Sequence, residues 1–175
     1  MTSTLTAVLL LTSGCGPDKQ GQPTPTTVNT SAATAALWDP CTQISDGTLQ
    51  GLGVVPSTRK SDVAGVAEPG WKVCAWHDST SDWNYSLGVW STIHTVEEFK
   101  KKPDNVDFAS ISVGGREGFR FHTVTDTAKA DCDLVFPSSQ GAFQITVLSA
   151  TSSKPVPACD KAMAAAQVLV PTFPK

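Results

Sequence analysis

Three histidines, His77, His94 and His122, are the residues in this chain best suited to acid–base chemistry. His77 precedes Asp78, but neighbouring residues of a strand point to opposite faces, so these two side chains would not form a dyad. Asp126 stands four positions after His122 and could lie near it. The chain has no GxSxG motif that would supply a serine nucleophile beside them. We therefore expect that the protein is not an enzyme.

The acidic residues do not predict a metal site. Asp126, Asp131 and Asp133 lack the spacing of an EF-hand loop and its closing glutamate, and the chain has no HExxH motif. Gly114-Gly115 is a single turn, too short to cradle a phosphate. We therefore expect no metal and no cofactor.

Five cysteines are more informative than the histidines. They are Cys15, Cys41, Cys74, Cys132 and Cys159. An odd number in an exported chain calls for a special role for one of them. The residues before Cys15 indicate such a role, because this cysteine follows the apolar stretch Leu5–Leu11 and the small residues Thr12-Ser13-Gly14. This order is similar to a lipobox, the processing site at which a bacterial lipoprotein receives its lipid.

The lipobox divides the chain into three parts. Residues 1–14 are predicted to be a lipoprotein signal peptide, residues 15–36 a flexible tether rich in Pro, Thr and Ser, and residues 37–175 a single domain. The lipid on Cys15 would hold the protein on the extracytoplasmic face of the cell membrane. Two features depart from the pattern: Thr12 stands where Leu is usual, and Met1–Thr4 carry no basic residue. The alternative is an apolar N-terminus without this role.

The other four cysteines are enough for two disulfides, which are typical of exported proteins. None of them forms a CxxC pair, so zinc or thioredoxin-like redox roles are poorly supported. We favour Cys41–Cys74 with Cys132–Cys159, since each bridge would tie a terminal helix to a strand. Four cysteines allow two further sets, which stay open: Cys41–Cys159 with Cys74–Cys132, and Cys41–Cys132 with Cys74–Cys159.

Trp76 and Trp90 are the candidate binding residues. Trp90 is predicted to lie on the strand face opposite Trp83, Tyr85 and Leu87, and Trp76 also lies on the minority face of its strand. An exposed aromatic patch at these positions would suit a ligand or a protein partner. The alternative is packing beneath a helix or against a disulfide.

The elements that would position these residues are strands and short helices. Alternating apolar residues predict strands over 71–77, 83–89, 106–113, 117–124, 132–136 and 142–150. Capping residues predict helix starts at Asp39-Pro40, at Ser45 or Asp46, and at Thr95, and an alanine-rich helix after Cys159. The predicted fold is therefore α+β, an antiparallel β-sheet flanked by short N-terminal and C-terminal helices with two disulfides.

The composition fits one soluble globular domain and excludes some partners. The chain has 175 residues, of which 40% are hydrophobic and 17% charged. Its net charge of −3 gives no reason to expect nucleic acid, for which a basic patch is the usual footprint.

Several features occur together in this chain: the lipobox, Trp38-Asp39-Pro40-Cys41, Cys74-Ala75-Trp76, Cys132 on a later strand, and Cys159 opening the last helix. Their order resembles the domain of unknown function 3558 family, secreted lipoproteins of actinobacteria. The resemblance covers Trp38 to Pro171 and implies a cell-envelope lipoprotein with this cysteine framework and no established activity.

We therefore expect a lipid-anchored cell-envelope lipoprotein whose domain binds an unidentified envelope protein or small ligand without catalysis. Its contact with the membrane would run through the lipid on Cys15. The alternatives are an envelope hydrolase with an unrecognised active site and a structural envelope spacer.

Overall fold

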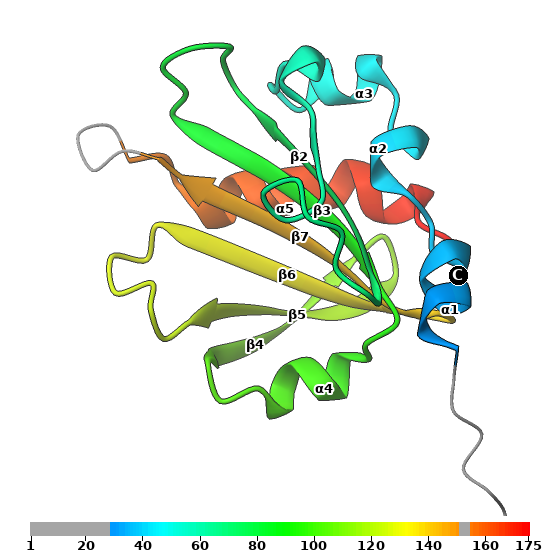
Figure 1. Cartoon of the computed structure of the whole chain (residues 1–175). Coiled ribbons are helices and arrows are strands. Elements are labelled where there is room, and N and C mark those ends of the chain that lie inside the picture. The colour runs from blue at the N-terminus through cyan, green and yellow to red at the C-terminus, as the bar shows by residue number, and fades with distance from the viewer. Residues whose placement is uncertain (1–28, 151–154) are drawn as a thin grey trace, which may run out of the picture.

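A seven-stranded antiparallel sheet organises the computed structural model, which describes residues 29–150 and 155–175 (Figure 1). The predicted signal peptide, Cys15 and the first part of the predicted tether lie outside the described residues. The strand order is β1-β2-β3-β7-β6-β5-β4. The strands are β1 (Lys60–Ser61), β2 (Trp71–His77), β3 (Tyr85–Thr92), β4 (Asn105–Val113), β5 (Arg116–Thr123), β6 (Asp131–Ser138) and β7 (Gly141–Ser149).

Five α-helices and two 3₁₀ turns accompany the sheet in the described ranges. They are α1 (Thr30–Ala36), α2 (Pro40–Gln43), α3 (Asp46–Gly51), η1 (Pro56–Thr58), α4 (Val96–Lys101), α5 (Ala158–Leu169) and η2 (Val170–Thr172). The predicted α+β class, with an antiparallel sheet between N-terminal and C-terminal helices, is confirmed.

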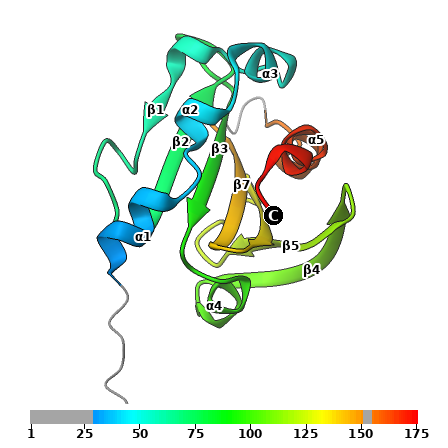
Figure 2. The ribbon, with the colours of Figure 1, turned by 90° about the vertical axis from the view of Figure 1, so that its right-hand side faces the viewer.

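Helix α5 lies against one face of the sheet (Figure 2), and the main core lies between them. Ala162, Ala166 and Leu169 place the apolar side of α5 against Ile145 and Val147 of β7. Small alanine side chains let the helix approach the strands closely. The alanine-rich stretch that predicted this helix therefore also sets its distance from the sheet.

Both disulfides have the pairing that we favoured from the sequence. Cys41 of α2 bonds Cys74 of β2, and Cys132 of β6 bonds Cys159 of α5. Asp39 caps α2 by accepting a 2.9 Å hydrogen bond from the Cys41 backbone N–H, which orients the first of these cysteines. Each bridge thus ties a terminal helix to a strand.

The other face of the sheet, here the α4 face, carries a second apolar cluster. Its buried members are Val96, Phe99, Phe121, Val135 and Ala142, and Trp71, Phe108 and Phe119 pack against them. Helix α4 covers only part of this face (Figure 2). The remainder of the α4 face holds the candidate site.

The tether prediction over residues 15–36 is wrong at its C-terminal end, because Thr30–Ala36 form α1. Four of the seven residues of α1 are alanine, the strongest helix former, and the Asn29 side chain accepts a 3.1 Å hydrogen bond from the Ala32 backbone. Thr34 Oγ1 accepts a 2.7 Å bond from the Gly70 N–H, which docks the helix on the domain. Helix α1 therefore lies before residue 37, at which the sequence analysis placed the start of the domain.

The second predicted strand starts two residues later than expected, at Tyr85 instead of Trp83. Asp78 explains the shift, because its carboxylate accepts hydrogen bonds from the Asn84 N–H at 2.8 Å and the Asn84 side chain at 2.9 Å. These bonds extend the hairpin loop. Trp83 lies in that loop, stacked on His77 with ring centroids 4.3 Å apart.

None of the helices in the part of the chain that the structure describes has the length and apolar character needed to span a bilayer.

Candidate ligand cleft on the α4 face

Trp76 and Trp90 lie on opposite faces of the sheet, so the predicted patch does not form. Trp76 pairs with Leu87 and is 0% exposed in the core beneath α5. Trp90 pairs with Val73 on the α4 face and is partly exposed. The alternation within each strand did not show which face the last helix would cover, and α5 covers the face of Trp76.

A cleft of about 550 Å³ opens on the α4 face beside Trp90. Its side walls are aromatic, and we name it the aromatic cleft after Trp71, Trp90, Phe99 and Phe121. Its floor consists of four polar side chains, Asp131, Asp133, Gln144 and Thr146. Its remaining lining residues are Val63, Glu68, Lys102, Asn105 and Thr123. This size and this mixture of apolar walls and few polar groups are typical of small-molecule sites.

The four aromatic rings form a continuous row of edge contacts. Trp71 lies 5.8 Å from Trp90 at 83° and 5.9 Å from Phe99 at 71°, measured between ring centroids and planes. Phe99 lies 6.0 Å from Phe121 at 64°. Edge-to-face contacts of this kind fix ring orientation as well as position. Phe99 and Phe121 are buried, whereas the two tryptophans remain half-buried at the cleft.

The polar floor comes from two paired strands, β6 and β7. Asp133 pairs directly with Thr146, and its neighbour on the same face is Gln144. Thr146 Oγ1 donates a 2.6 Å hydrogen bond to Asp133 Oδ1, and Gln144 Nε2 donates a 2.8 Å bond to the same oxygen. Both donors are neutral and both use one carboxylate oxygen, although Asp133 is only 4% exposed.

Asp131 and Asp133 are two residues apart on β6 and therefore share the α4 face. Burial, followed by the charges of Asp126 and Asp133, raises the pKa of Asp131 from its usual 3.8 to about 6. Burial also raises the pKa of Asp133, although the bonds from Thr146 and Gln144 oppose this shift. Asp131 Oδ1 is buried without a hydrogen-bond partner.

No basic side chain among the described residues is paired with Asp131 or Asp133. The ion pairs found there join His94 to Glu98, Lys100 to Glu97, and His122 to Asp126. The floor of the cleft thus contains two partly desolvated carboxyl groups, and the side-chain donors to Asp133 are both neutral.

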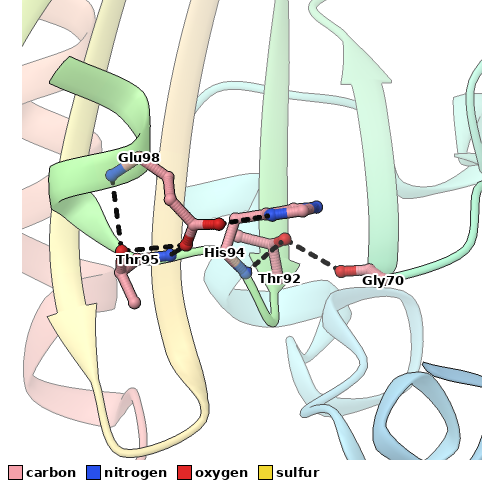
Figure 3. Close-up of polar contacts among 5 residues, drawn as sticks. All are labelled: Gly70, Thr92, His94, Thr95 and Glu98. Atoms are coloured by element: carbon pink, nitrogen blue, oxygen red, sulfur yellow. Dashed lines mark hydrogen bonds and ion pairs between the residues drawn. The ribbon is translucent and has the colours of Figure 1, made fainter. Parts of the chain in front are cut away.

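A second hollow of about 340 Å³ adjoins the cleft and shares Trp71, Phe99 and Lys102 with it. His94 and Glu98 complete its lining at the start of α4 (Figure 3). His94 Nδ1 lies 3.4 Å from Glu98 Oε1, and the His94 ring lies 5.5 Å from Trp71.

Helix capping fixes this pair. Thr95 Oγ1 accepts a 3.3 Å bond from the Glu98 N–H, and Glu98 Oε2 accepts a 2.6 Å bond from the Thr95 N–H, which is the capping box expected from the sequence. Glu98 Oε2 also accepts a 2.9 Å bond from Thr95 Oγ1, and the two bonds that this oxygen accepts from Thr95 lower the pKa of Glu98. Thr92 Oγ1 accepts from the His94 N–H at 3.1 Å and donates to the Gly70 carbonyl at 2.8 Å, so the hollow is tied to β2 and β3 (Figure 3).

The three histidines of the sequence analysis do not converge. His77 lies beside Trp83 in the hairpin, His94 lies in the second hollow, and His122 Nδ1 lies 3.0 Å from the Asp131 carbonyl oxygen. Neither hollow has a serine or cysteine among its described lining residues. Asp126 accepts backbone bonds from Ala130 and Asp131, and so closes the loop before β6. Within residues 29–150 and 155–175, no group of three His, Cys, Asp or Glu side chains is arranged to hold a metal.

A further hollow of about 460 Å³ lies at the far end of the sheet, beside Arg116. The Arg116 guanidinium donates to the Phe173 carbonyl at 3.1 Å and to the Pro174 carbonyl at 2.8 Å. The strongest polar group there is already engaged by the chain itself, so the aromatic cleft is the better candidate.

Sequence reasoning missed most of the cleft. Trp71, Gln144 and Thr146 were not singled out, and Asp133 was considered only as a metal ligand and rejected. The sequence nevertheless contains a signal for the three polar residues. Asp133 falls within a strand between buried apolar residues, and Gln144 and Thr146 alternate with Phe143 and Ile145. Polar side chains on one face of two adjacent central strands are uncommon unless that face is solvated or has a binding role.

Comparison with known proteins gives one match. The family described as "Protein of unknown function (DUF3558)" matches residues 10–172. No curated protein and no solved structure matches the chain.

Proposed function

Since the chain belongs to the DUF3558 family, which is itself without a known function, we propose a function from its structure and sequence: a lipid-anchored extracytoplasmic domain that binds a small molecule in the aromatic cleft without transforming it. The observation that carries the binding role is the cleft itself, in which aromatic walls surround a hydrogen-bonded polar floor. The proposal also counts this chain among the secreted lipoproteins of actinobacteria.

The membrane anchor is supported by the lipobox at Cys15 and by the two disulfides. Disulfides form and persist mainly outside the cytoplasm, and all four described cysteines are paired. Cys15 is the remaining cysteine of the chain and directly follows Thr12-Ser13-Gly14. This division of roles accounts for the odd number of cysteines.

Metabolic labelling with an alkyne fatty acid tests the anchor. The wild-type protein should take up label and fractionate with the membrane, and Cys15→Ala should lose both properties. Ser13→Ala is the matched control, because it keeps a small residue beside the cysteine and should be labelled like the wild type. An unlabelled wild type, or a fully labelled Cys15→Ala variant, would overturn the anchor.

Ligand-observed NMR of the purified protein tests the binding role. The probes are a panel of sugars, alkylammonium compounds, carboxylic acids and neutral alcohols. At least one class should show saturation transfer that is lost in Trp71→Leu and kept in Trp83→Leu, since Trp83 lies in the hairpin loop outside the cleft. Circular dichroism establishes that both variants are folded. No transfer with any class would overturn the binding role.

The two rival functions make different demands. A hydrolase needs a nucleophile or an activated water beside His94 and Glu98, and turnover of a chromogenic ester, lost in His94→Gln, would support it. A structural spacer has no use for a desolvated carboxyl group in an open cleft, and the absence of binding by every probe would favour it.

A further inference from the structure

We propose that the ligand of the aromatic cleft is a small organic cation, an alkylammonium compound whose charged end lies at Asp131 and Asp133 and whose alkyl groups lie against Trp71 and Trp90. This inference rests on the proposed function, because it names the chemical class of the molecule that the cleft would bind.

The charge of the cleft is the first argument. A buried carboxylate is strongly disfavoured unless a counter-charge or several hydrogen bonds compensate it. Asp133 is 4% exposed and receives two bonds from neutral groups on one oxygen, and one oxygen of Asp131 is buried without a donor. No ion pair among the described residues joins a basic side chain to Asp131 or Asp133, and a cationic ligand would supply that direct contact.

The balance of charges in the lining points the same way. The described lining residues include three carboxyl groups, from Glu68, Asp131 and Asp133, against one ammonium group, from Lys102. Asp131 and Asp133 lie in the floor, whereas Lys102 is exposed just after α4. The field in the floor therefore favours a positive group, and low-dielectric walls increase its strength.

The aromatic walls are the second and independent argument. The electron-rich faces of tryptophan rings attract ammonium groups, and tryptophan is the strongest of the aromatic side chains in this role. Trp71 and Trp90 both line the cleft and keep part of their surface open to it. Their mutual edge contact at 83° holds the two rings in different planes, so an alkylammonium group could touch both.

A sugar is the nearest competing ligand, because tryptophan and polar side chains also bind carbohydrates. A neutral polyol would satisfy hydrogen bonds but would leave the carboxylate charge of Asp133 uncompensated. A cation removes this cost and uses the same aromatic walls. The observations therefore favour the cation, and binding of sugars becomes an outcome of the test.

Choline and 3,3-dimethyl-1-butanol are the probes that separate charge from shape. Choline has a positively charged nitrogen at its branched centre, and the alcohol has a neutral carbon at the same place. Titration of the purified protein, followed by tryptophan fluorescence and calorimetry, should give an affinity for choline at least about tenfold higher than for the alcohol. Butylammonium and glucose extend the comparison to a primary amine and a neutral polyol.

Two variants locate the effect. Asp133→Asn keeps the size of the side chain and should weaken choline binding about tenfold or more, and Asp131→Asn should weaken it less because that carboxyl group is more exposed. Asp82→Asn, in the exposed hairpin loop, is the control and should bind like the wild type. Asp131→Asn also serves if Asp133→Asn does not fold.

The outcomes distinguish the two proposals. Equal affinity for choline and its neutral analogue, or choline binding that survives both aspartate variants, would overturn the cation while leaving the binding role intact. Binding of glucose without choline would do the same. Failure of every probe, in this titration and in the NMR panel, would overturn the binding role and the inference together.

Discussion

Thr146 Oγ1 lies 2.6 Å from Asp133 Oδ1 and donates to it across the β6–β7 pair, so a hydroxyl group holds a buried carboxyl group in place at the centre of the sheet. Gln144 donates to the same oxygen from two residues away on β7. Neither partner carries a charge. A sheet selected for stability alone would place apolar side chains here, and such departures are typical of functional sites.

Replacing Asp131 by asparagine should stabilise the protein at neutral pH. The pKa of Asp131 is about 6 in the folded protein and near 3.8 when unfolded, so the folded state binds more protons between these values. The stabilising contribution of this group is therefore complete below about pH 4 and is lost as the pH rises through 6. Because Asp131 is partly exposed, solvent screening reduces this effect. We therefore expect Asp131→Asn to raise the free energy of unfolding by about 1 kcal/mol at pH 8 and by little at pH 4.

Urea unfolding at both pH values measures this difference. Asp82→Asn is the control, since Asp82 is exposed and should show no such pH-dependent gain. A loss of stability in Asp131→Asn at pH 8 would contradict the prediction.

Choline binding should weaken as the pH falls from 7.5 to 5, because protonation of Asp131 removes a negative charge from the cleft. With a pKa of about 6, this group alone lowers the affinity by up to about tenfold over that range. The groups that face Asp131 are Asp126, Asp133 and His122, and the other charged groups of the lining are Glu68 and Lys102.

Asp126, Asp133 and His122 also face Asp131, so the wild-type profile alone does not separate the contribution of Asp131 from theirs. The Asp131→Asn variant separates them, because it should flatten the part of the profile that belongs to Asp131. Fluorescence titration at several pH values measures both proteins. An unchanged profile in the variant would assign the pH dependence to another group.

Replacing Thr146 by valine should destabilise the protein by about 1–3 kcal/mol at pH 7. The change keeps the side-chain shape but removes a donor to a buried carboxyl group, which leaves that group less satisfied. Chemical denaturation measures the loss, with Thr127→Val in an exposed loop as the control. A nearly neutral effect would mean that water replaces the hydroxyl group readily.

Removing either disulfide should cost about 3–4 kcal/mol of unfolding free energy on the chain-entropy description. The bridges span sequence separations of 33 and 27 residues, so the double variants Cys41→Ser/Cys74→Ser and Cys132→Ser/Cys159→Ser should lose similar amounts. Urea unfolding measures both, and titration of free thiols in the unreduced wild type checks the pairing. A free thiol at any of these four positions would contradict it.

Much of the fold follows from local sequence patterns. The hairpin strands, the capping box at Thr95 and Glu98, and the alanine-rich last helix are each specified by residues close together in the chain. Local patterns also placed each cysteine on the correct kind of element, which favoured the pairing that the structure shows.

The cleft could not be predicted in this way, because it depends on a pairing between distant strands. Trp90 lies beside Gln144 only because β3 pairs with β7, and no local sequence pattern specifies that β7 is the neighbour of β3. The face that α5 covers is decided by the same long-range packing, which buries Trp76 and leaves Trp90 at the cleft. Helix α1 was missed because its polar neighbours masked a short alanine-rich stretch with an asparagine cap.

The pairing of β3 with β7 has a mechanical consequence. The β3–β7 pair is a seam between two halves of the described structure. The first half, residues 29–92, contains the disulfide Cys41–Cys74, and the second, residues 105–175, contains Cys132–Cys159. Along the chain, residues 93–104 connect the two halves. The cleft straddles this seam, with Trp71 and Trp90 on one side and Asp133 and Thr146 on the other. A ligand bound in the cleft would contact both halves and hold them together. Ligand binding should therefore slow the hydrogen exchange of the backbone amides of β3 and β7.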